Sequence, residues 1–431
     1  MHFRFSSYKK KFKIKVYNFF TFIINKSVFF SNIIFYINLV FLNNYFSLFK
    51  IKYISNQKSY REFNVSTISY NYNYLSFDTN KNIKKTKKLN GLGYSLLENC
   101  SIIASSEFIF KNNFCYGQKH KLPFSLNYIK FNNFKGSLSS NSKYILCSRN
   151  RIANKKIDKA VYISGSYDLN WYHWLIEVLP KLYIFKKIIN HYKDYQIVVP
   201  ERIVKSINHK KTLSLFTDLN NIITIKQGVF YNVESLLYIE SPSYSDFEMK
   251  KKLKVKIQNG NLYYDVLHSY TKFIKSKIIC NKNFQNKYIY LYRKTNKRKF
   301  NQNEVLEVLR KFHFEIIDAY KLSFIDQVNI FNSAKIIVGP PGAAWANIIF
   351  AKRGSYGLIF RPNIIGDSST FPNLSKLVGL SLYSQDMKTE ESDWQKIMRS
   401  NREAHIDIDL LKKNILNIFS LIHNKQHETK P

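Results

Sequence analysis

One segment of the chain places two proton-transfer groups one helical turn apart. It runs from Asn170 to Lys181, and its apolar residues predict a helix. His173 and Glu177 stand at positions i and i+4, so both side chains lie on one face of that helix. A carboxylate beside a histidine orients the imidazole and makes it more basic. The pair is a candidate for acid–base chemistry or for orienting a substrate, while a structural ion pair and a partial metal site fit the same spacing.

A second segment concentrates positive charge directly after an apolar run. Residues 288–292 predict a strand, and Arg293, Arg298 and Lys299 follow it closely. Guanidinium groups at the carboxyl end of a strand are well placed to neutralise phosphates. A solvated run of surface charge is the alternative interpretation.

A third segment is a strand that runs into a glycine-containing turn and then into a helix. Residues 335–339 form the expected strand, and Gly342 and Ala343 follow it. Their backbone N–H groups would point from the start of the helix toward an anion. The segment is neither a Walker A loop nor a GxGxxG motif. A tight turn that serves only packing would have the same pattern.

Alternating strands and helices are expected to position these three segments. In the last third, strands are predicted at 288–292, 314–317, 335–339 and 357–360, and helices at 303–312, 324–334, 345–350 and 408–422. Before them the pattern predicts a helix over 171–189 and strands at 101–104, 108–110, 144–147, 160–163, 196–200 and 221–225. This alternation predicts an α/β protein with a parallel, doubly wound sheet, whose ligands bind at the carboxyl ends of the strands.

Composition narrows the class of protein. A chain of 431 residues that is 45% apolar and 16% aromatic can bury a sizeable core, which excludes a mostly disordered or fibrous protein. Four cysteines without a Cys/His ligand pattern give no zinc site and favour reduced thiols in a cytoplasmic compartment. Much of the formal charge of +38 fits a bias toward residues with A/T-rich codons, because lysine, asparagine, isoleucine, phenylalanine and tyrosine are all abundant. A basic surface would still favour acidic lipid headgroups and sugar nucleotides. No nucleic-acid partner is expected, because no RNA-binding aromatic signature, zinc finger or basic heptad accompanies the charge.

The first 90 residues differ from the rest and predict a basic, aromatic extension. A lysine cluster within residues 9–15 precedes residues 27–49, which carry no charge. That order fits a single signal anchor, a helix lying in the membrane interface, or a soluble extension. Residues 51–90 are polar and predict a linker. We expect two α/β domains after this extension, over 91–270 and 271–425.

In chain order, four blocks within about residues 92–420 together resemble glycosyltransferase family 61. The matching positions are Asn170, His173, Glu177 and Pro180, then Arg293, Arg298, Asn303 and Glu304, then Ser323, Phe324, Asp326 and Gln327, and finally Gly339, Gly342, Ala343, Asn347, Gly354 and Ser355. Two positions depart from the family pattern. Pro341 stands where the family has a histidine, and Lys181 replaces an arginine.

The resemblance implies a GT-B-like fold, in which two Rossmann-like α/β domains face a cleft. The domain over 91–270 would be on the acceptor side, and the domain over 271–425 would bind the nucleotide sugar. It implies a hexosyl- or pentosyltransferase that moves a sugar from a nucleotide-sugar donor to a glycan or lipid-linked acceptor, with inversion, in surface polysaccharide biosynthesis. His173 and Glu177 would be catalytic, no metal or other cofactor is expected, and the protein would lie at the cytoplasmic face of the membrane. The donor would be bound by Arg293, Arg298, Gln327, Gly339, Gly342, Ala343 and Asn347.

Two other functions fit parts of the same sequence. Pro341 is compatible with a relative that binds nucleotide sugars or glycans without catalysis. The high positive charge is compatible with a basic, membrane-associated structural protein.

Overall fold

The structure is a computed structural model, and it describes most of the chain after residue 45. The described residues are 46–77, 84–118, 137–140, 144–148, 151–152, 156–250, 255–278, 287–294, 299–362, 368–388 and 404–428. The chain forms two compact units: unit 1 comprises Met1–Asn64 and Asn90–Ser241, and unit 2 comprises Val65–Leu89 and Pro242–Pro431. The units are therefore divided after Ser241, whereas the sequence analysis places its boundary at residue 270.

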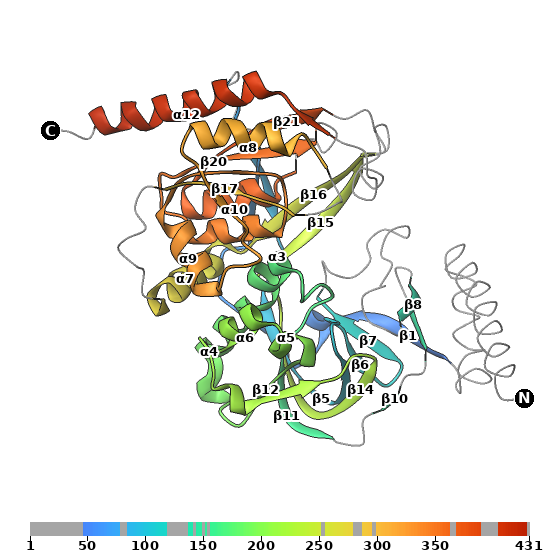
Figure 1. The fold of residues 1–431 in the computed structure, drawn as a ribbon. Helices are drawn as coiled ribbons and strands as arrows, with labels where there is room; N and C mark the ends of the chain where they lie inside the picture. Colours follow the sequence, from blue (N-terminus) through green and yellow to red (C-terminus); the bar gives the residue numbers. More distant parts are fainter. Residues whose placement is uncertain are drawn as a thin grey trace, which may run out of the picture. The chain divides into compact units, whose positions relative to one another are not determined.

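A twelve-stranded sheet dominates unit 1 (Figure 1). Its strands run in the spatial order β13-β12-β11-β14-β5-β6-β7-β1-β9-β8, with β10 beside β14 and β2 beside β5. They span β1 Phe46–Tyr53, β2 Arg61–Glu62, β5 Gly93–Ile103, β6 Ile109–Lys111, β7 Phe114–Gly117, β8 Ser137–Ser140, β9 Tyr144–Ser148, β10 Arg151–Ile152, β11 Ile157–Tyr162, β12 Gln196–Pro200, β13 Ile222–Ile225 and β14 Val229–Ile239.

The strands that matter for the site form the parallel part of this sheet. β12 pairs in parallel with both β11 and β13, and β14 pairs in parallel with the other side of β11. In chain order these four strands lie third, second, first, fourth, which is the order of half a Rossmann fold. The strand order reverses between β11 and β14, so a ligand of this unit is expected at their carboxyl ends.

Short helices connect the parallel strands of unit 1. Between β11 and β12 the chain forms α3 Trp171–His173, the π-turn η4 Trp174–Val178, α4 Pro180–Ile188 and η5 Ile189–His191. Between β12 and β13 it forms α5 Glu201–Lys205, α6 Ile207–Leu213 and η6 Leu219–Asn221. A further turn, η2 Ile54–Asn56, follows β1. The predicted helix over 171–189 is thus present, but in several pieces.

Unit 2 contains a six-stranded sheet with the order β18-β17-β19-β20-β21-β22. Every pairing is parallel except that of β22 with β21. Numbered along the chain, the first five strands of this sheet lie in the flavodoxin-like order 2-1-3-4-5. The strand order reverses between β17 and β19. The strands span β17 Lys287–Leu291, β18 Glu315–Ile317, β19 Ala334–Gly339, β20 Tyr356–Pro362, β21 Ser381–Lys388 and β22 His405–Ile406.

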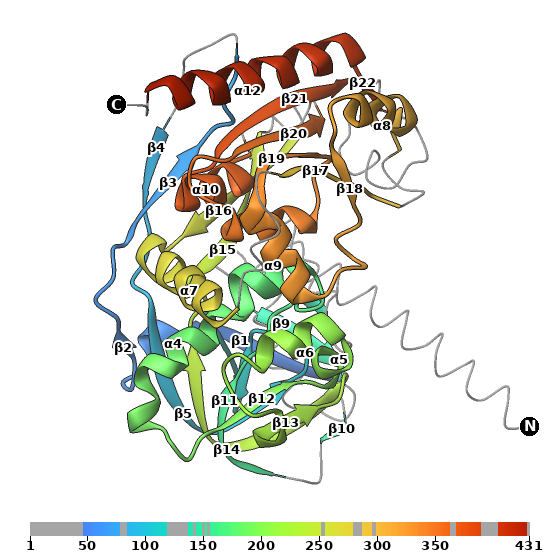
Figure 2. The same cartoon turned by 60° about the vertical axis from the view of Figure 1, so that its left-hand side comes forward.

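Helices cover both faces of this sheet (Figure 2). α8 and α12 pack their apolar residues, including Val305 and Ile415, against Val338 and Leu358 in one buried cluster. On the opposite face lie α9 and η7, where a Cβ on Gly357 of β20 would be 3.4 Å from the Trp345 ring. The helices of unit 2 span α7 Tyr264–Lys277, α8 Gln302–Lys311, α9 Phe324–Ser333, η7 Ala343–Phe350, α10 Thr370–Val378 and α12 Ile408–Glu428.

The predicted α/β class is confirmed by these two sheets. Where the sequence has a continuous apolar run, the predicted and observed bounds agree closely. β12 and β19, predicted at 196–200 and 335–339, are examples. Asp407 caps the start of α12: its Oδ1 accepts a hydrogen bond from the N–H of Leu410 at 3.0 Å, which lowers the pKa of the carboxyl.

The prediction of a linker over 51–90 needs correction, because this segment forms strands in both units. In unit 2, β3 Ile68–Tyr72 and β4 Lys84–Lys88 pair as an antiparallel hairpin. Ser69 is fully buried there and accepts a hydrogen bond from Leu262 in the second hairpin, β15 Ser243–Lys250 and β16 Val255–Leu262. The polar composition of 51–90 is misleading because strand pairing and a few buried apolar side chains, among them Ile54 and Leu89, attach this segment to the fold.

Most of the predicted extension, residues 1–45, lies outside the described residues. Only Phe46–Phe49 of the uncharged segment 27–49 is described, as the start of β1. Among the helices of the described ranges, none combines the length and the apolar character needed to cross a bilayer. Cys100 and Cys115 are buried as free thiols in unit 1, while Cys280 lies outside the described residues.

Candidate active site

The helix that carries His173 and Glu177 contains a π-turn. Asn170 caps its start, because its Oδ1 accepts a hydrogen bond from the N–H of Tyr172 at 3.0 Å. The N–H of Leu179 then reaches back five residues to the carbonyl oxygen of Trp174 at 2.8 Å. Pro180 has no N–H, so the wider register stops there and α4 begins with proline at its first position. Single π-turns of this kind are frequent at functional sites.

His173 and Glu177 form a close charged pair in this turn. Nδ1 of His173 lies 3.1 Å from Oε2 of Glu177, and the two side chains are 19% and 10% exposed. The contact lacks hydrogen-bond geometry and is an ion pair only when the imidazole is protonated. The ring of Tyr167 stacks on the imidazole at 5.0 Å between ring centres. Glu177 is thus buried, while part of the imidazole of His173 is exposed to solvent.

Two hydrogen bonds join this helix to the carboxyl ends of β11 and β14. The hydroxyl of Ser241, just beyond β14, donates to the carbonyl oxygen of Glu177 at 2.7 Å. The ammonium group of Lys181 donates to the carbonyl oxygen of Ser164, just beyond β11, at 3.0 Å. The catalytic candidates therefore stand at the point of unit 1 where the strand order reverses, which is where α/β sheets bind ligands.

Sequence reasoning missed Glu240, a buried carboxyl at the same strand end. Its Oε2 accepts hydrogen bonds from the Tyr60 hydroxyl at 2.8 Å and from the Gly93 N–H at 2.9 Å. Burial nevertheless raises the pKa of Glu240 to about 7, since desolvation outweighs these donors and the attraction of Lys181. No local pattern marks this residue, because its partners come from positions more than a hundred residues away.

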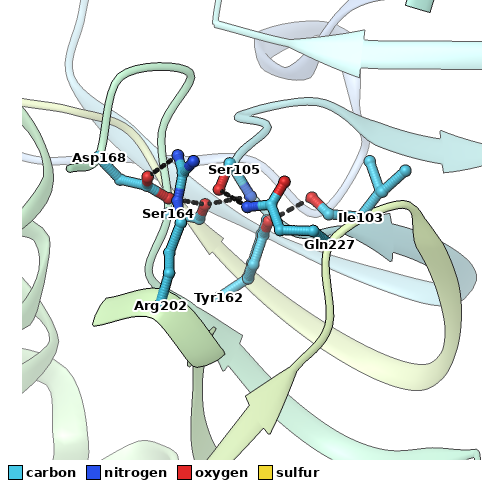
Figure 3. Close-up of polar contacts among 7 residues, drawn as sticks. All are labelled: Ile103, Ser105, Tyr162, Ser164, Asp168, Arg202 and Gln227. Atoms are coloured by element: carbon cyan, nitrogen blue, oxygen red, sulfur yellow. Dashed lines mark hydrogen bonds and ion pairs between the residues drawn. The ribbon is translucent and has the colours of Figure 1, made fainter. Parts of the chain in front are cut away.

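Sequence reasoning also missed a polar network beyond the strands of unit 1 (Figure 3). Asp168 is fully buried; its Oδ1 accepts a hydrogen bond from Nη2 of Arg202, and its Oδ2 accepts one from the Ser164 hydroxyl at 3.2 Å. The Ser164 hydroxyl in turn accepts from the N–H of Ser105 at 3.1 Å, and the Ser105 hydroxyl accepts from the side-chain amide of Gln227. Burial raises the pKa of Asp168 even though Arg202 opposes that shift.

The anion-binding candidates of unit 2 meet at its own reversal point. Arg293 follows β17, and its Nη1 donates to the carbonyl oxygen of Pro341 in the turn after β19, at 3.1 Å. A Cβ on Gly339 would lie 2.9 Å from Cβ of Leu291, so only glycine lets the ends of β17 and β19 approach this closely. A Cβ on Gly342 would lie 3.8 Å from Nη1 of Arg293. The guanidinium and the glycine turn, 48 residues apart in sequence, thus form one cationic corner.

Burial gives this corner its electrostatic character. Arg293 is partly buried, and desolvation lowers the pKa of its guanidinium, which nonetheless keeps its charge at neutral pH. Within the described part of the chain, no carboxylate forms an ion pair with Arg293. A partly desolvated cation whose contact is a carbonyl oxygen is suited to an anionic ligand.

The turn itself is fixed by Trp345. The indole N–H of this fully buried residue donates to the carbonyl oxygen of Pro340 at 2.9 Å. Gly342 precedes η7 in an extended conformation, with φ near −179°, and Ala343 is the first residue of that helix. The N–H groups of Gly342 and Ala343 therefore belong to the start of a helix, as predicted from the sequence.

Two other donor-binding candidates are engaged with each other. The side-chain amide of Asn347 donates to Oε1 of Gln327 at 2.8 Å, and that of Gln327 donates to the carbonyl oxygen of Leu322 at 3.2 Å. Both side chains are buried, so this pair joins α9 to η7 beneath the turn. Arg298 lies outside the described residues. In the described ranges, no three His, Cys, Asp or Glu side chains gather as a metal ion would require.

Each unit therefore combines a parallel α/β sheet with a polar or cationic site at the carboxyl ends of its strands, which defines the ligand-binding α/β class. Residues 171–358 match the model of the family described as Glycosyltransferase 61. This match confirms the family predicted from the sequence, and it identifies this region as that of a family 61 glycosyltransferase. The matched region contains all of the predicted site residues, from His173 to Asn347. A search of curated proteins finds no match.

Proposed function

We propose that this protein transfers a hexose or pentose from a nucleotide-sugar donor to the hydroxyl of a glycan or lipid-linked acceptor, with inversion at the sugar carbon. The observation that carries the proposal is the contact between Arg293 and the turn at Pro341, at the reversal point of unit 2. This corner offers a guanidinium and helix-start N–H groups to one anion. A diphosphate is an anion of the required charge and size.

The donor's departing diphosphate gains negative charge as the bond from the sugar carbon to the phosphate oxygen breaks. Arg293 and the N–H groups of Gly342 and Ala343 would stabilise that charge. Gln327 and Asn347 would act from beneath by holding α9 and η7 in place, since their amides already bond to each other. No metal is required in this proposal, because the guanidinium and the backbone dipoles supply the positive potential.

The acceptor hydroxyl must lose its proton as its oxygen attacks the sugar carbon on the face opposite the phosphate. His173 and Glu177 are the proposed base and its orienting partner, at 3.1 Å from each other and with the imidazole partly exposed. The proton passes to this pair while the new carbon–oxygen bond forms. The GT-B arrangement of the two domains around a cleft, as implied by the family resemblance, is part of this proposal.

The cellular setting is the third part of the proposal. We expect the basic N-terminal residues to hold the protein at the cytoplasmic face of the membrane, where lipid-linked acceptors of surface polysaccharides are found.

Calorimetry with a panel of nucleoside diphosphates, followed by turnover assays with the matching nucleotide sugars, tests the function. Binding of a nucleoside diphosphate and release of sugar from its donor, unaffected by EDTA, are expected. Protein that binds no member of the panel would contradict the proposal.

A relative that binds donors without catalysis is the second candidate, and it is favoured by Pro341. This proline offers only its carbonyl oxygen, to Arg293, where the family has an imidazole. Nucleotide binding without release or transfer of sugar would support this candidate over the enzyme.

A further inference from the structure

The polar network around Asp168 sits directly before the helix of the candidate base. Asp168 is five residues ahead of His173, in the segment that connects β11 to α3. Figure 3 shows its carboxylate facing the guanidinium of Arg202, with Ser164, Ser105 and Gln227 continuing the network. The mechanism proposed above uses none of these side chains.

The network joins the ends of neighbouring strands at one point. Arg202 follows β12, Ser164 follows β11, Ser105 follows β5 and Gln227 follows β13. A carboxylate without any solvent exposure is costly unless it is paired, so Asp168 strongly favours the backbone conformation that brings it to Arg202. The segment is thereby attached to the most rigid part of the sheet.

Backbone turns then carry this constraint toward His173. The N–H of Asp168 bonds to the carbonyl oxygen of Gly165 at 3.3 Å, and that of Asn170 bonds to Tyr167 at 2.8 Å. Asn170 is also the cap of α3. Two turns and a helix cap therefore connect Asp168 to the start of α3.

Tyr167, the residue before Asp168, stacks on the candidate base, whose ring also meets the ring of Tyr172 edge-on at 5.4 Å between ring centres. The Tyr167 ring lies 5.0 Å from the imidazole of His173, tilted by 26°, although 53% of the residue is exposed to solvent. An exposed tyrosine has little packing of its own to keep it on one face of a histidine. Its place depends on the backbone at residues 165–170.

We propose that Asp168 and Arg202 are positioning residues, which hold Tyr167 against His173 and thereby fix the orientation of the candidate base. The geometric claim does not depend on the proposed function; only its consequence for sugar transfer rests on that function. Loss of the Arg202 contact would release the 165–170 segment, separate Tyr167 from His173, and leave the imidazole free to rotate.

The experiment is NMR of the full chain with ¹³C-labelled histidine, in which His173→Gln identifies the signal of His173. Tyr167→Leu removes the ring and is expected to shift the His173 signal downfield, since a stacked aromatic ring shields the protons above it. Arg202→Gln is expected to shift the same signal in the same direction. Arg202→Lys keeps the positive charge, so its His173 signal should lie closer to that of wild type than the signal of Arg202→Gln does.

The matched control is Lys205→Gln on the same short helix, where Lys205 is largely exposed and pairs only with Glu201 among the ion pairs of the described residues. It should leave the His173 signal in place. A folded Arg202→Gln protein with an unmoved His173 signal overturns the proposal, as does an unmoved signal in Tyr167→Leu. If Arg202→Gln does not fold, the His173 signal of Tyr167→Leu decides, and it must move downfield for the proposal to stand.

A transfer assay adds a second readout once a donor is known. Arg202→Lys should lower kcat while the donor KM stays unchanged, because Arg202 belongs to unit 1 and the proposed diphosphate site belongs to unit 2. If wild-type protein neither binds nor cleaves any donor, the proposed function fails, yet the NMR result still decides on the positioning residues.

Discussion

Arg293 and Pro341 are joined by a hydrogen bond of 3.1 Å from the guanidinium to the proline carbonyl oxygen. The bond connects the loop after β17 to the turn after β19, the two strands between which the order of the sheet reverses. It orients the arginine toward Gly342, and it is the one hydrogen bond that the guanidinium makes to the described residues. Pro341, which stands where the family has a histidine, is thus also the residue whose carbonyl oxygen holds Arg293.

Replacement of Arg293 by alanine should weaken the binding of nucleoside diphosphates by about 1.5–3 kcal/mol, the usual contribution of a charged hydrogen bond. This corresponds to a loss of roughly 10- to 150-fold in affinity. Calorimetry measures it directly. Lys294→Ala is the control, because Lys294 is the exposed neighbour of Arg293 and should change the affinity little. Equal affinities for wild type and a folded Arg293→Ala protein would remove the arginine from the donor site.

The two glycines of the turn should respond differently to alanine. At Gly339 the new Cβ would meet Cβ of Leu291 at 2.9 Å and its carbonyl oxygen at 3.1 Å, so Gly339→Ala should destabilise the protein by about 1–3 kcal/mol. At Gly342 the backbone is extended and the new methyl group fits, at 3.8 Å from Arg293. Gly342→Ala should therefore fold normally but bind nucleotides more weakly, because the methyl group fills space beside the guanidinium. Thermal melts paired with calorimetry separate the two effects, and normal nucleotide affinity in Gly342→Ala would argue against an anion at this turn.

Glu177→Gln removes a charge from the candidate base pair while it keeps the shape of the side chain. Sugar transfer should fall by at least about 100-fold, within the range that a positioned base contributes. Donor affinity and melting temperature should change little. His173→Ala should have a similar effect, and the double variant should be little worse than either single one, since the two groups 3.1 Å apart would act as a unit. Near-normal turnover in Glu177→Gln would exclude the catalytic role, whereas a much lower melting temperature would indicate a structural ion pair.

Glu240 should make the stability of unit 1 depend on pH. Folded Glu240 keeps its proton up to a pKa of about 7, whereas the unfolded side chain releases it near 4.5. The folded state therefore binds more protons between these values, and its stability falls as pH rises through this window. Glu240→Gln cannot titrate, so its stability relative to wild type should increase from pH 5 to pH 7, by on the order of 2–3 kcal/mol.

Buried His209 changes the pH dependence of stability in the opposite direction. Because both proteins contain His209, its effect cancels when Glu240→Gln is compared with wild type. Burial lowers the pKa of His209 to about 4, below the usual value of 6.5, so its contribution to stability rises with pH over that range. Urea unfolding of both proteins at several pH values gives the difference. Free energies of unfolding that stay parallel from pH 5 to pH 7 would show that Glu240 is ionised throughout.

Deletion of residues 1–45 should move the protein from the membrane fraction to the soluble fraction without unfolding it. The cut must fall before Phe46, because Phe46–Tyr53 form β1, which pairs with β7 and β9. Deletion of the whole of 1–53 should instead destabilise unit 1, since two neighbouring strands lose their partner. Fractionation of cell lysates and flotation with anionic vesicles measure the association. Full-length protein that stays in solution in both assays would contradict membrane attachment.

The sequence by itself determined those features that depend on near neighbours. The apolar period of 171–189 predicted a helix, and the spacing of His173 and Glu177 put them on one face, as the structure has them. Ser323 illustrates the same point, because its hydroxyl caps α9 by accepting from the N–H of Asp326 three residues later. The cationic loop and the glycine turn could be assigned to strand ends because parallel strands end at the same edge of a sheet.

Only the tertiary structure decided which distant residues become partners. It placed residues 65–89 in unit 2 by strand pairing, paired Gln327 with Asn347, and buried Asp168 against Arg202 and Glu240 against Tyr60. Periodicity and helix capping act over a few residues and can be read along the chain. Strand pairing and the burial of charge join residues far apart in the sequence, and the free energy of each depends on a partner that no local pattern identifies.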